Sequence, residues 1–243
     1  MKFNLDEYIS LLDRIQKEGY VFCDFENIQK KSFILRHDID VSPKIALEMA
    51  KAENSLGIRA TYFFMMRSPF YNLFSRANNE IVKKIISLGH EIGLHYDEGY
   101  YSKNTDLQML IDTEIKVLEN NFDIKVNAVS FHQPSQKIID NEIKIKQINT
   151  YDKEFFKDIK YLSDSNMIFK EDPIDIIKSQ EFSKIQLLVH PIWWVADGET
   201  TEQKWINSIK KNFELEQKQV LLTERAYGNK KVMILEVDNG IVS

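Results

Sequence analysis

A chain of 243 residues, 43% hydrophobic and 28% charged, has the composition of an ordinary globular protein with a substantial buried core. The net charge of −5 argues against a general nucleic-acid binder, and no apolar run approaches the roughly 20 residues of a membrane span. The single cysteine, Cys23, excludes a disulfide within the chain and a cysteine-rich zinc site.

The first predicted element is an amphipathic helix over residues 4–19. It carries acidic residues throughout and lacks the uninterrupted apolar stretch of a secretory signal peptide. We therefore expect a cytoplasmic protein. No internal repeat or flexible linker divides the chain, which predicts a single domain over residues 1–243.

Strand-like and helix-like apolar patterns alternate from residue 33 onward. We expect strands at residues 33–40, 60–66, 90–95, 126–132, 161–165, 184–190 and 230–237. We expect helices at residues 42–57, 78–89, 105–122 and 201–227. The alternation predicts an α/β fold, a distorted (β/α) barrel of about seven parallel strands. No glycine-rich phosphate loop follows a strand, which argues against Rossmann and P-loop nucleotide folds.

Charged and imidazole side chains stand at the carboxyl ends of five predicted strands. They are Asp38 and Asp40, His95 followed by Tyr96 and Asp97, His132, Asp164, and His190 followed by Trp193 and Trp194. In parallel barrels the carboxyl ends of the strands carry the active site. We therefore expect these residues, which are far apart in the sequence, to converge on one pocket.

Alternation along the first strand separates the roles of its polar residues. Asp38 and Asp40 should face one side of the sheet and His37 the other. Two carboxylates this close raise the proton affinity of one of them unless a cation intervenes. A metal ion would supply that cation, with one carboxylate as its ligand and the other as a base. Arg36 is expected to pair with a carboxylate of the site and keep it ionised.

Four segments together resemble one known family. They are "RHDID" (36–40), "GHEIGLHYD" (89–97), "SFHQP" (130–134) and "LLVHPIWW" (187–194). The combination is similar to the motifs of the polysaccharide deacetylase superfamily, also called NodB-homology or carbohydrate esterase family 4-like. It looks closest to a divergent branch found among bacterial surface-polysaccharide synthesis proteins, such as those of lipopolysaccharide. The resemblance covers residues 33–194, with residues 4–19 and 201–237 as additions to this core.

The resemblance implies a metal-dependent hydrolase that removes an N- or O-acetyl group from a sugar. Asp38 matches the general base, His190 the catalytic acid, and Asp40 and His95 two metal ligands. The family's second metal histidine stands four residues after the first, where this chain has Gly99. His132 at the next strand end is the expected replacement, and Asp97 is its rival.

The implied cofactor is a divalent metal, Zn²⁺ first, with Fe²⁺, Co²⁺ and Ni²⁺ as alternatives. The implied substrate is a small or carrier-linked acetylated sugar, a cytoplasmic precursor of a surface polysaccharide. The residues expected to contact it are Arg36, Tyr96, Asp164, Trp193 and Trp194. A structural role is the alternative for His132, Asp164 and the two tryptophans. The sequence leaves the oligomeric state open.

Three other functions remain open from the sequence. The chain could hydrolyse a C–N bond in an amide that is not a sugar. It could be a catalytically inactive binding module, which the glycine at position 99 favours. It could be a non-haem iron oxygenase with His95, Asp97 and His190 as the facial triad, although the strand–helix alternation opposes the jelly roll in which that chemistry usually occurs.

Overall fold

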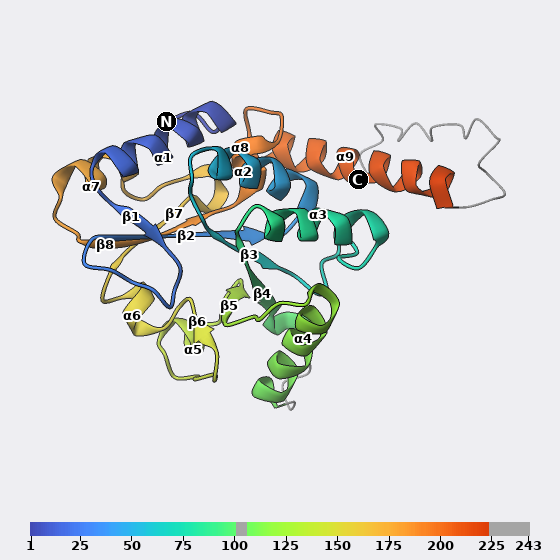
Figure 1. Cartoon of the computed structure of the whole chain (residues 1–243), viewed down its shortest axis with the longest axis horizontal. Helices are drawn as coiled ribbons and strands as arrows, with labels where there is room; N and C mark the ends of the chain where they lie inside the picture. Colours follow the sequence, from blue (N-terminus) through green and yellow to red (C-terminus); the bar gives the residue numbers. More distant parts are fainter. Residues whose placement is uncertain (101–105, 224–243) are drawn as a thin grey trace.

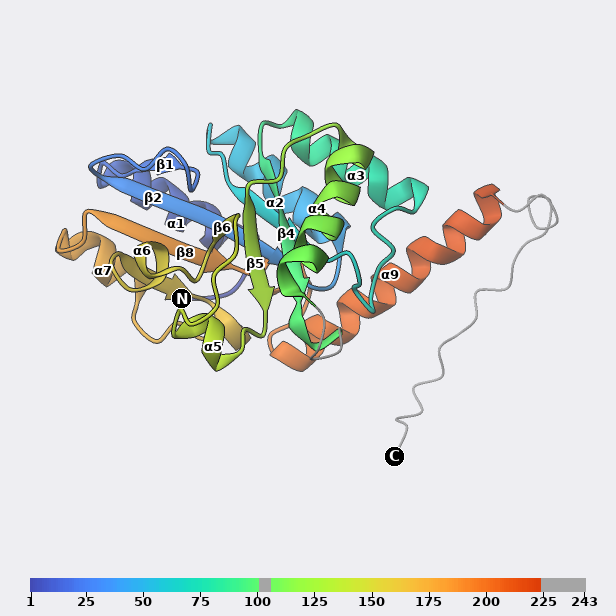
Figure 2. The same ribbon diagram turned by 90° about the horizontal axis from the view of Figure 1, so that it is seen from below.

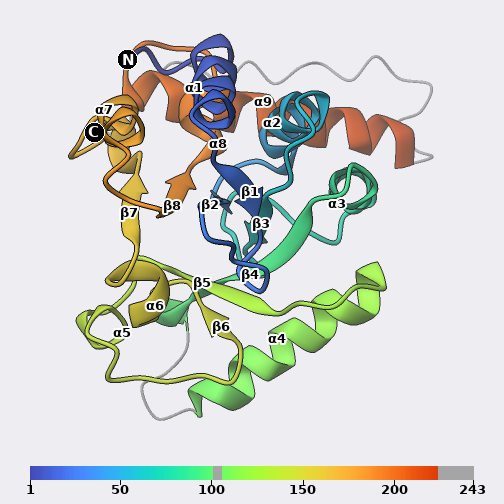
Figure 3. The ribbon, with the colours of Figure 1, turned by 60° about the vertical axis from the view of Figure 1, so that its left-hand side comes forward.

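A parallel sheet, curled into a half-barrel, organises the structure, which is a computed structural model describing residues 1–100 and 106–223 (Figures 1 and 3). Seven strands follow the order β6-β5-β4-β3-β2-β8-β7, and β1 pairs with the first part of β2. Every strand pair is parallel. The strands are β1 Val21–Cys23, β2 Ser32–Ile39, β3 Thr61–Phe64, β4 Glu91–Asp97, β5 Ala128–His132, β6 Ile148–Asn149, β7 Lys160–Ser163 and β8 Lys184–Val189. The prediction of a distorted barrel with about seven parallel strands is therefore confirmed.

Helices α1 to α4 lie along the outer side of this curl (Figure 3). Their sequences explain their formation: in α1, Asn4 caps the first turn, and the buried Tyr8, Leu11, Leu12 and Ile15 repeat at helical spacing. Within the described residues, none of the helices is both long enough and apolar enough to cross a lipid bilayer. The helices are α1 Leu5–Lys17, α2 Pro43–Ser55, α3 Arg76–Ser87, α4 Leu107–Phe122, α5 Gln136–Ile139, α6 Lys153–Phe156, α7 Pro173–Ser179, α8 Pro191–Val195 and α9 Thr201–Thr223, with single 3₁₀ turns η1 Glu98–Tyr100 and η2 Ser165–Met167.

Most of the predicted helices and strands are present in the structure. The differences are predicted elements that lie outside the described residues and short elements that were not predicted. Six predicted strands and all five predicted long helices are present, whereas the strand at 230–237 and the end of the helix at 201–227 lie outside the described residues. The short strands β1 and β6 and the short helices α5 to α8 were not predicted. Two to seven residues are too few to establish a period. The division of the chain into one domain with terminal additions stays a prediction.

The inner face of the half-barrel changes from apolar to polar along its strands. Toward the amino ends, Ile34 on β2 and Ala128 on β5 belong to a small buried cluster. Arg36 and Asp38 follow Ile34 on the same face of β2, because alternate residues of a strand share a side, and Asp40 comes directly after the strand. The functional groups therefore gather at the carboxyl ends of the strands.

Gly93 in the "GHEIGLHYD" motif has a packing reason. A Cβ atom at this position would lie 2.3 Å from the Cδ1 and Cε1 atoms of the Phe63 ring on the neighbouring strand β3. Only a residue without a side chain lets that ring fill the interior of the half-barrel at this level.

Candidate active site

A cavity of about 580 Å³ opens at the carboxyl ends of the strands. It brings together residues that are far apart in the sequence, from Asp40 to Trp205. Its lining contains the polar residues Asp40, His95, Asp97, His132, Gln133, Ser165, Asn166 and His190, and the apolar residues Met65, Pro69, Phe70, Trp193 and Trp205. A cavity of this size accommodates a small molecule.

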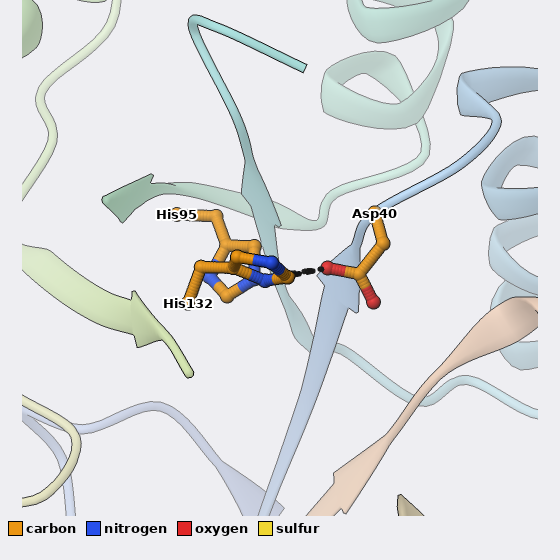
Figure 4. Close-up of side chains that lie close together, drawn as sticks. All are labelled: Asp40, His95 and His132. Atoms are coloured by element: carbon orange, nitrogen blue, oxygen red, sulfur yellow. Dashed lines mark hydrogen bonds and ion pairs between the residues drawn. The ribbon is translucent and has the colours of Figure 1, made fainter. Parts of the chain in front are cut away.

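Asp40, His95 and His132 all line this cavity, and their side chains point toward one another (Figure 4). Asp40 follows β2, while His95 lies on β4 and His132 ends β5, so three neighbouring strands contribute one side chain each. Asp40 Oδ1 lies 3.1 Å from His95 Nε2 and 3.2 Å from His132 Nδ1. The two ring nitrogens are 3.3 Å apart.

This set of donors fits a divalent metal ion. Ligands about 2.0–2.1 Å from a tetrahedral zinc ion lie roughly 3.3 Å from one another, close to the three separations observed. The second ring nitrogen of His95, Nδ1, lies 3.0 Å from the carbonyl oxygen of Ser130, and this contact orients the ring so that Nε2 faces Asp40. Burial alone would raise the pKa of Asp40, but the hydrogen bonds of His132 and His95 outweigh it and hold the pKa well below its usual range.

Asp97 is placed differently from the three converging residues. It lines the cavity, but its Oδ1 accepts a hydrogen bond from the Gly99 amide at 2.9 Å. Among the described residues, the group of carboxylate and imidazole atoms within 4.8 Å of one another contains His132 and not Asp97. The geometry therefore favours His132 as the replacement for the histidine missing at position 99.

We expect His132→Ala to weaken zinc binding by more than the roughly 10- to 100-fold typical of changes outside the ligand set. The matched control is Asp97→Ala, which removes a carboxylate from the same cavity and should leave the affinity unchanged. Competition with a chromophoric chelator measures both. If zinc binding were weakened in Asp97→Ala and unchanged in His132→Ala, Asp97 would be the third ligand.

Asp38 lies on β2, the strand that Asp40 follows, and is almost fully buried. Its Oδ2 accepts a hydrogen bond from the Ser130 hydroxyl at 2.9 Å and lies 3.6 Å from Arg36 Nη2. Its Oδ1 has no hydrogen-bond partner among the residues that the structure describes. Burial acts against the charge of Arg36, but Asp38 outweighs it, so the pKa of Arg36 is raised and the guanidinium stays a cation beside this carboxylate.

His190 lines the same cavity and is held by Asp164. Its ring Nδ1 lies 2.6 Å from Asp164 Oδ1, and its backbone amide donates to the same carboxylate at 3.0 and 3.1 Å. Trp194 donates its indole N–H to Asp164 Oδ2 at 2.7 Å. Burial alone would lower the pKa of His190, but the fully buried Asp164 outweighs it and raises the pKa to about 9.

We expect Asp164→Asn to lower the pKa of His190 from about 9 toward its ordinary value near 6.5. Since the folded-state pKa is raised, the protonated imidazole stabilises the fold fully below about pH 6.5, and this contribution is lost as the pH rises through about 9. NMR titration of the histidine ring protons in metal-free protein measures the shift. Asp97→Asn, a carboxylate of the same cavity bound to the Gly99 amide, is the control. An unchanged His190 titration in Asp164→Asn would contradict this assignment.

Four of the five residues expected to contact substrate do not line the cavity. Tyr96 is 1% exposed and packs edge-on against Phe131 in the core, because it alternates with His95 and so faces the opposite side of the sheet. Arg36 is fully buried beneath Asp38, and Asp164 and Trp194 are buried behind His190. In the structure these four side chains make structural and positioning contacts, and their contact with a substrate stays a prediction. Of the five, only Trp193 lines the cavity.

The facial triad of an iron oxygenase is not formed. His190 Nδ1 is occupied by Asp164, and neither His190 nor Asp97 belongs to the converging group of described residues. That interpretation of the sequence is wrong, because nearness along the chain to His95 does not place Asp97 beside a metal position.

The cavity also contains residues that the sequence analysis did not single out. Phe70 precedes α3, and Trp205 lies on α9, with ring centroids 5.2 Å apart. Gln133 and Asn166 line the cavity with φ angles of 46° and 57°, a left-handed backbone that is uncommon for residues other than glycine. Two features of the sequence could have indicated these residues. They are the "HQP" sequence around Gln133 and the tryptophan in the last predicted helix, Trp205.

Neither the protein-family models nor the curated proteins give a match to this chain. Among solved structures, the chain is similar to the Streptococcus pyogenes deacetylase PplD in complex with acetate, at 13% identity and a TM-score of 0.47 over 84% of this chain and 87% of that one. It is similar to the peptidoglycan deacetylase PdaC from Bacillus subtilis, at 12% identity and a TM-score of 0.45 over 82% and 98%. It is also similar to BA3943, a CE4 family pseudoenzyme from Bacillus anthracis, at 16% identity and a TM-score of 0.43 over 82% and 65%.

Two of these structures are deacetylases and one is a CE4 family pseudoenzyme. A family 4 carbohydrate esterase from Bacillus anthracis is also similar, at 13% identity and a TM-score of 0.41 over 86% of each chain. The identities and TM-scores describe a similarity of shape only. The divergent branch stays a prediction, and the chemistry of this chain has to be argued from its own side chains.

Proposed function

We propose that this chain is a metal-dependent hydrolase that removes an acetyl group from an acetylated sugar. The observation that carries the proposal is the convergence of Asp40, His95 and His132, at 3.1–3.3 Å from one another, in a cavity that His190 also lines. Asp38 is close to this group, with its Oδ2 4.0 Å from His95 Nδ1. A pure binding site needs neither a carboxylate base nor a histidine acid at these positions.

Asp40, His95 and His132 would hold the metal ion. A bound divalent cation lowers the pKa of a water molecule toward about 7 and polarises an acyl oxygen. Asp38 Oδ1, the carboxylate oxygen without a protein partner among the described residues, would take the proton of the attacking water. Arg36 and Ser130 orient this carboxylate through its other oxygen, Oδ2.

His190 would supply a proton to the departing amine or hydroxyl. Its Nδ1 is fixed by Asp164, which leaves Nε2 as the ring nitrogen for proton transfer. The raised pKa, about 9, keeps the ring protonated at neutral pH, as an acid requires. Hydrolysis then adds one water across the acetyl bond, releasing acetate and a free amine or hydroxyl group.

The cavity walls support a sugar as the substrate. Phe70, Trp193 and Trp205 form an aromatic side, with the Phe70–Trp205 and Trp193–Trp205 ring centroids 5.2 and 6.3 Å apart. Gln133, Asn166 and Asp97 supply amide and carboxylate groups on the same cavity. Apolar faces for C–H groups beside a few polar groups are the combination that a sugar ring needs.

Acetate release is the direct test. Zinc-loaded protein is incubated with nucleotide-linked and lipid-linked acetylated amino sugars, the cytoplasmic precursors proposed as substrates, and with O-acetylated sugars and simple N-acetyl amides. We expect acetate from one class of sugar, and none from protein carrying Asp40→Ala. Release from simple amides alone would assign the chain to non-sugar C–N hydrolysis.

A binding experiment separates the remaining alternative. Calorimetry with the same sugars and the zinc-loaded protein reports affinity without turnover. Sugar binding without acetate release from any of the compounds would overturn the enzymatic proposal and assign the chain to the inactive binding modules.

A further inference from the structure

His132 differs from His95 in how its ring is held. His95 is oriented by a contact from outside the converging group, since its Nδ1 lies 3.0 Å from the carbonyl oxygen of Ser130. The Nδ1 atom of His132 faces Asp40 and His95 themselves, at 3.2 and 3.3 Å, and no hydrogen bond of its Nε2 atom is found among the described residues. The His132 side chain is also 28% exposed. Its position therefore depends on the backbone that carries it.

The backbone turns sharply after His132. This histidine is the last residue of β5, Gln133 follows with a left-handed φ of 46°, and Pro134 comes next. Ser135 is the N-cap residue of α5, a helix of only four residues, and its side chain makes no capping hydrogen bond to this helix. So short a helix has little stability of its own. The segment therefore needs a partner from another element to stay in place.

Glu98 supplies that partner from the neighbouring strand end. Strands β4 and β5 lie side by side, with α5 beyond the end of β5 (Figure 2), and Asp97 is paired with His132 in their register. Glu98, the first residue of η1, accepts a hydrogen bond from the Ser135 amide at 2.9 Å through Oε2. Its other oxygen, Oε1, accepts one from the Ser135 hydroxyl at 3.2 Å. Both oxygens of one carboxylate thus hold a point three residues beyond His132.

The contact replaces one that a helix normally makes within its own sequence. In a capping box, the side chain three positions into the helix reaches back to the amide of the N-cap residue. In α5 that position is Ile138, which has no acceptor. Glu98 occupies this role from a different strand end. Two hydrogen bonds to one carboxylate restrain the direction of the segment as well as its distance, and carboxylate oxygens are strong acceptors.

We propose that Glu98 is a positioning residue for His132, because by holding Ser135 it fixes the strand end from which His132 reaches Asp40. The inference rests on the proposed function in one respect, namely that His132 is a metal ligand. Among the described residues, Glu98 neither belongs to the converging group nor lines the cavity. It therefore acts through the main chain, whereas metal-binding histidines usually have a partner on the ring itself.

Zinc affinity of the substrate-free protein tests the proposal. We expect Glu98→Ala to weaken zinc binding by about 10-fold or more in competition with a chromophoric chelator, as for other groups that orient metal ligands. Glu98→Gln should recover most of the affinity, because its amide oxygen can still accept the hydrogen bond of the Ser135 amide. The matched control is Asp140→Ala, which removes a carboxylate bound to the Gln136 side chain and should leave the affinity unchanged. Unchanged zinc binding in Glu98→Ala would overturn the proposal.

The hydroxyl of Ser135 provides a second test of the same contact. Ser135→Ala removes one of the two hydrogen bonds, so it should weaken zinc binding by less than Glu98→Ala does. Added to Glu98→Ala, it should have no further effect, because the contact is already broken. An equal loss in both backgrounds would show that the two residues act independently, contrary to the proposal.

The visible absorption of Co²⁺ bound in place of zinc separates a displaced His132 from a general loss of structure. This absorption depends on the number and geometry of the ligands. In Glu98→Ala it should shift toward the spectrum of His132→Ala, while the melting temperature of the metal-free protein stays close to that of the unmodified chain. An unchanged Co²⁺ spectrum, or a metal-free variant that does not fold, would also overturn the proposal.

These measurements use no sugar, so their outcome is distinguishable from that of the deacetylase test. Normal zinc binding in Glu98→Ala removes only the positioning role of Glu98. Absence of acetate release from the unmodified, zinc-loaded chain removes only the proposed reaction.

Discussion

Replacing Asp38 with Asn is expected to lower the turnover number for acetate release by roughly 10²- to 10⁴-fold, the usual contribution of a positioned general base. The reason is local: Asn retains the shape and the hydrogen bond from Ser130 but cannot take a proton from water. Steady-state kinetics with the substrate found in the acetate-release screen measures the loss.

Metal content separates the base from the metal ligands in this experiment. Zinc affinity should remain that of the unmodified chain in Asp38→Asn, because Asp38 lies outside the converging group of Asp40, His95 and His132. Asp40→Asn is the matched comparison two residues along the same face, and it should lose both metal and activity. Full activity in Asp38→Asn would remove the base assignment, and loss of zinc would place Asp38 among the ligands.

The largest expected effect on stability lies on the opposite side of the sheet, at Glu53. This fully buried carboxylate of α2 lies 2.7 Å from His37 Nε2, and it accepts hydrogen bonds from Tyr62, at 2.7 Å, and from Tyr8. Burial alone would raise the pKa of Glu53, but His37 outweighs it and the pKa is lowered, so the carboxylate is ionised. Glu53 thus joins α1, α2, β2 and β3 through one buried charge.

We expect Glu53→Ala to lower the free energy of unfolding by about 3–5 kcal/mol, because it leaves an imidazole and two hydroxyl groups buried without their partner. For a chain of this length the melting temperature should fall by about 10 °C. Urea denaturation measures the change. Glu48→Ala, which breaks an exposed pair with Lys51 on the same helix, is the control and should cost less than about 1 kcal/mol. A Glu53→Ala protein as stable as the control would show that the network contributes little.

Much of the fold was predictable because apolar residues repeat at a characteristic spacing in long helices and strands. The alternation of helices and strands from residue 33 onward predicted the parallel sheet, and the polar residues at strand ends predicted where the cavity opens. Alternation along β2 correctly separated Asp38 and Asp40 from His37, since geometry within one strand needs no tertiary information. The same rule, applied to β4, would have removed Tyr96 from the substrate-contacting set.

The tertiary structure alone decided which of the remaining side chains face the cavity. Trp193 and Trp194 are adjacent in the sequence, yet one lines the cavity and the other is buried against Asp164, because they point in different directions from the short helix α8. Trp205 lines the cavity because the first turns of α9 bring its ring centroid to 6.3 Å from that of Trp193 on α8. The sequence by itself determines the spacing of apolar residues in each helix or strand and the residue types at its ends. The packing of one element on another depends on contacts between residues far apart in the sequence, and no local sequence pattern contains these contacts.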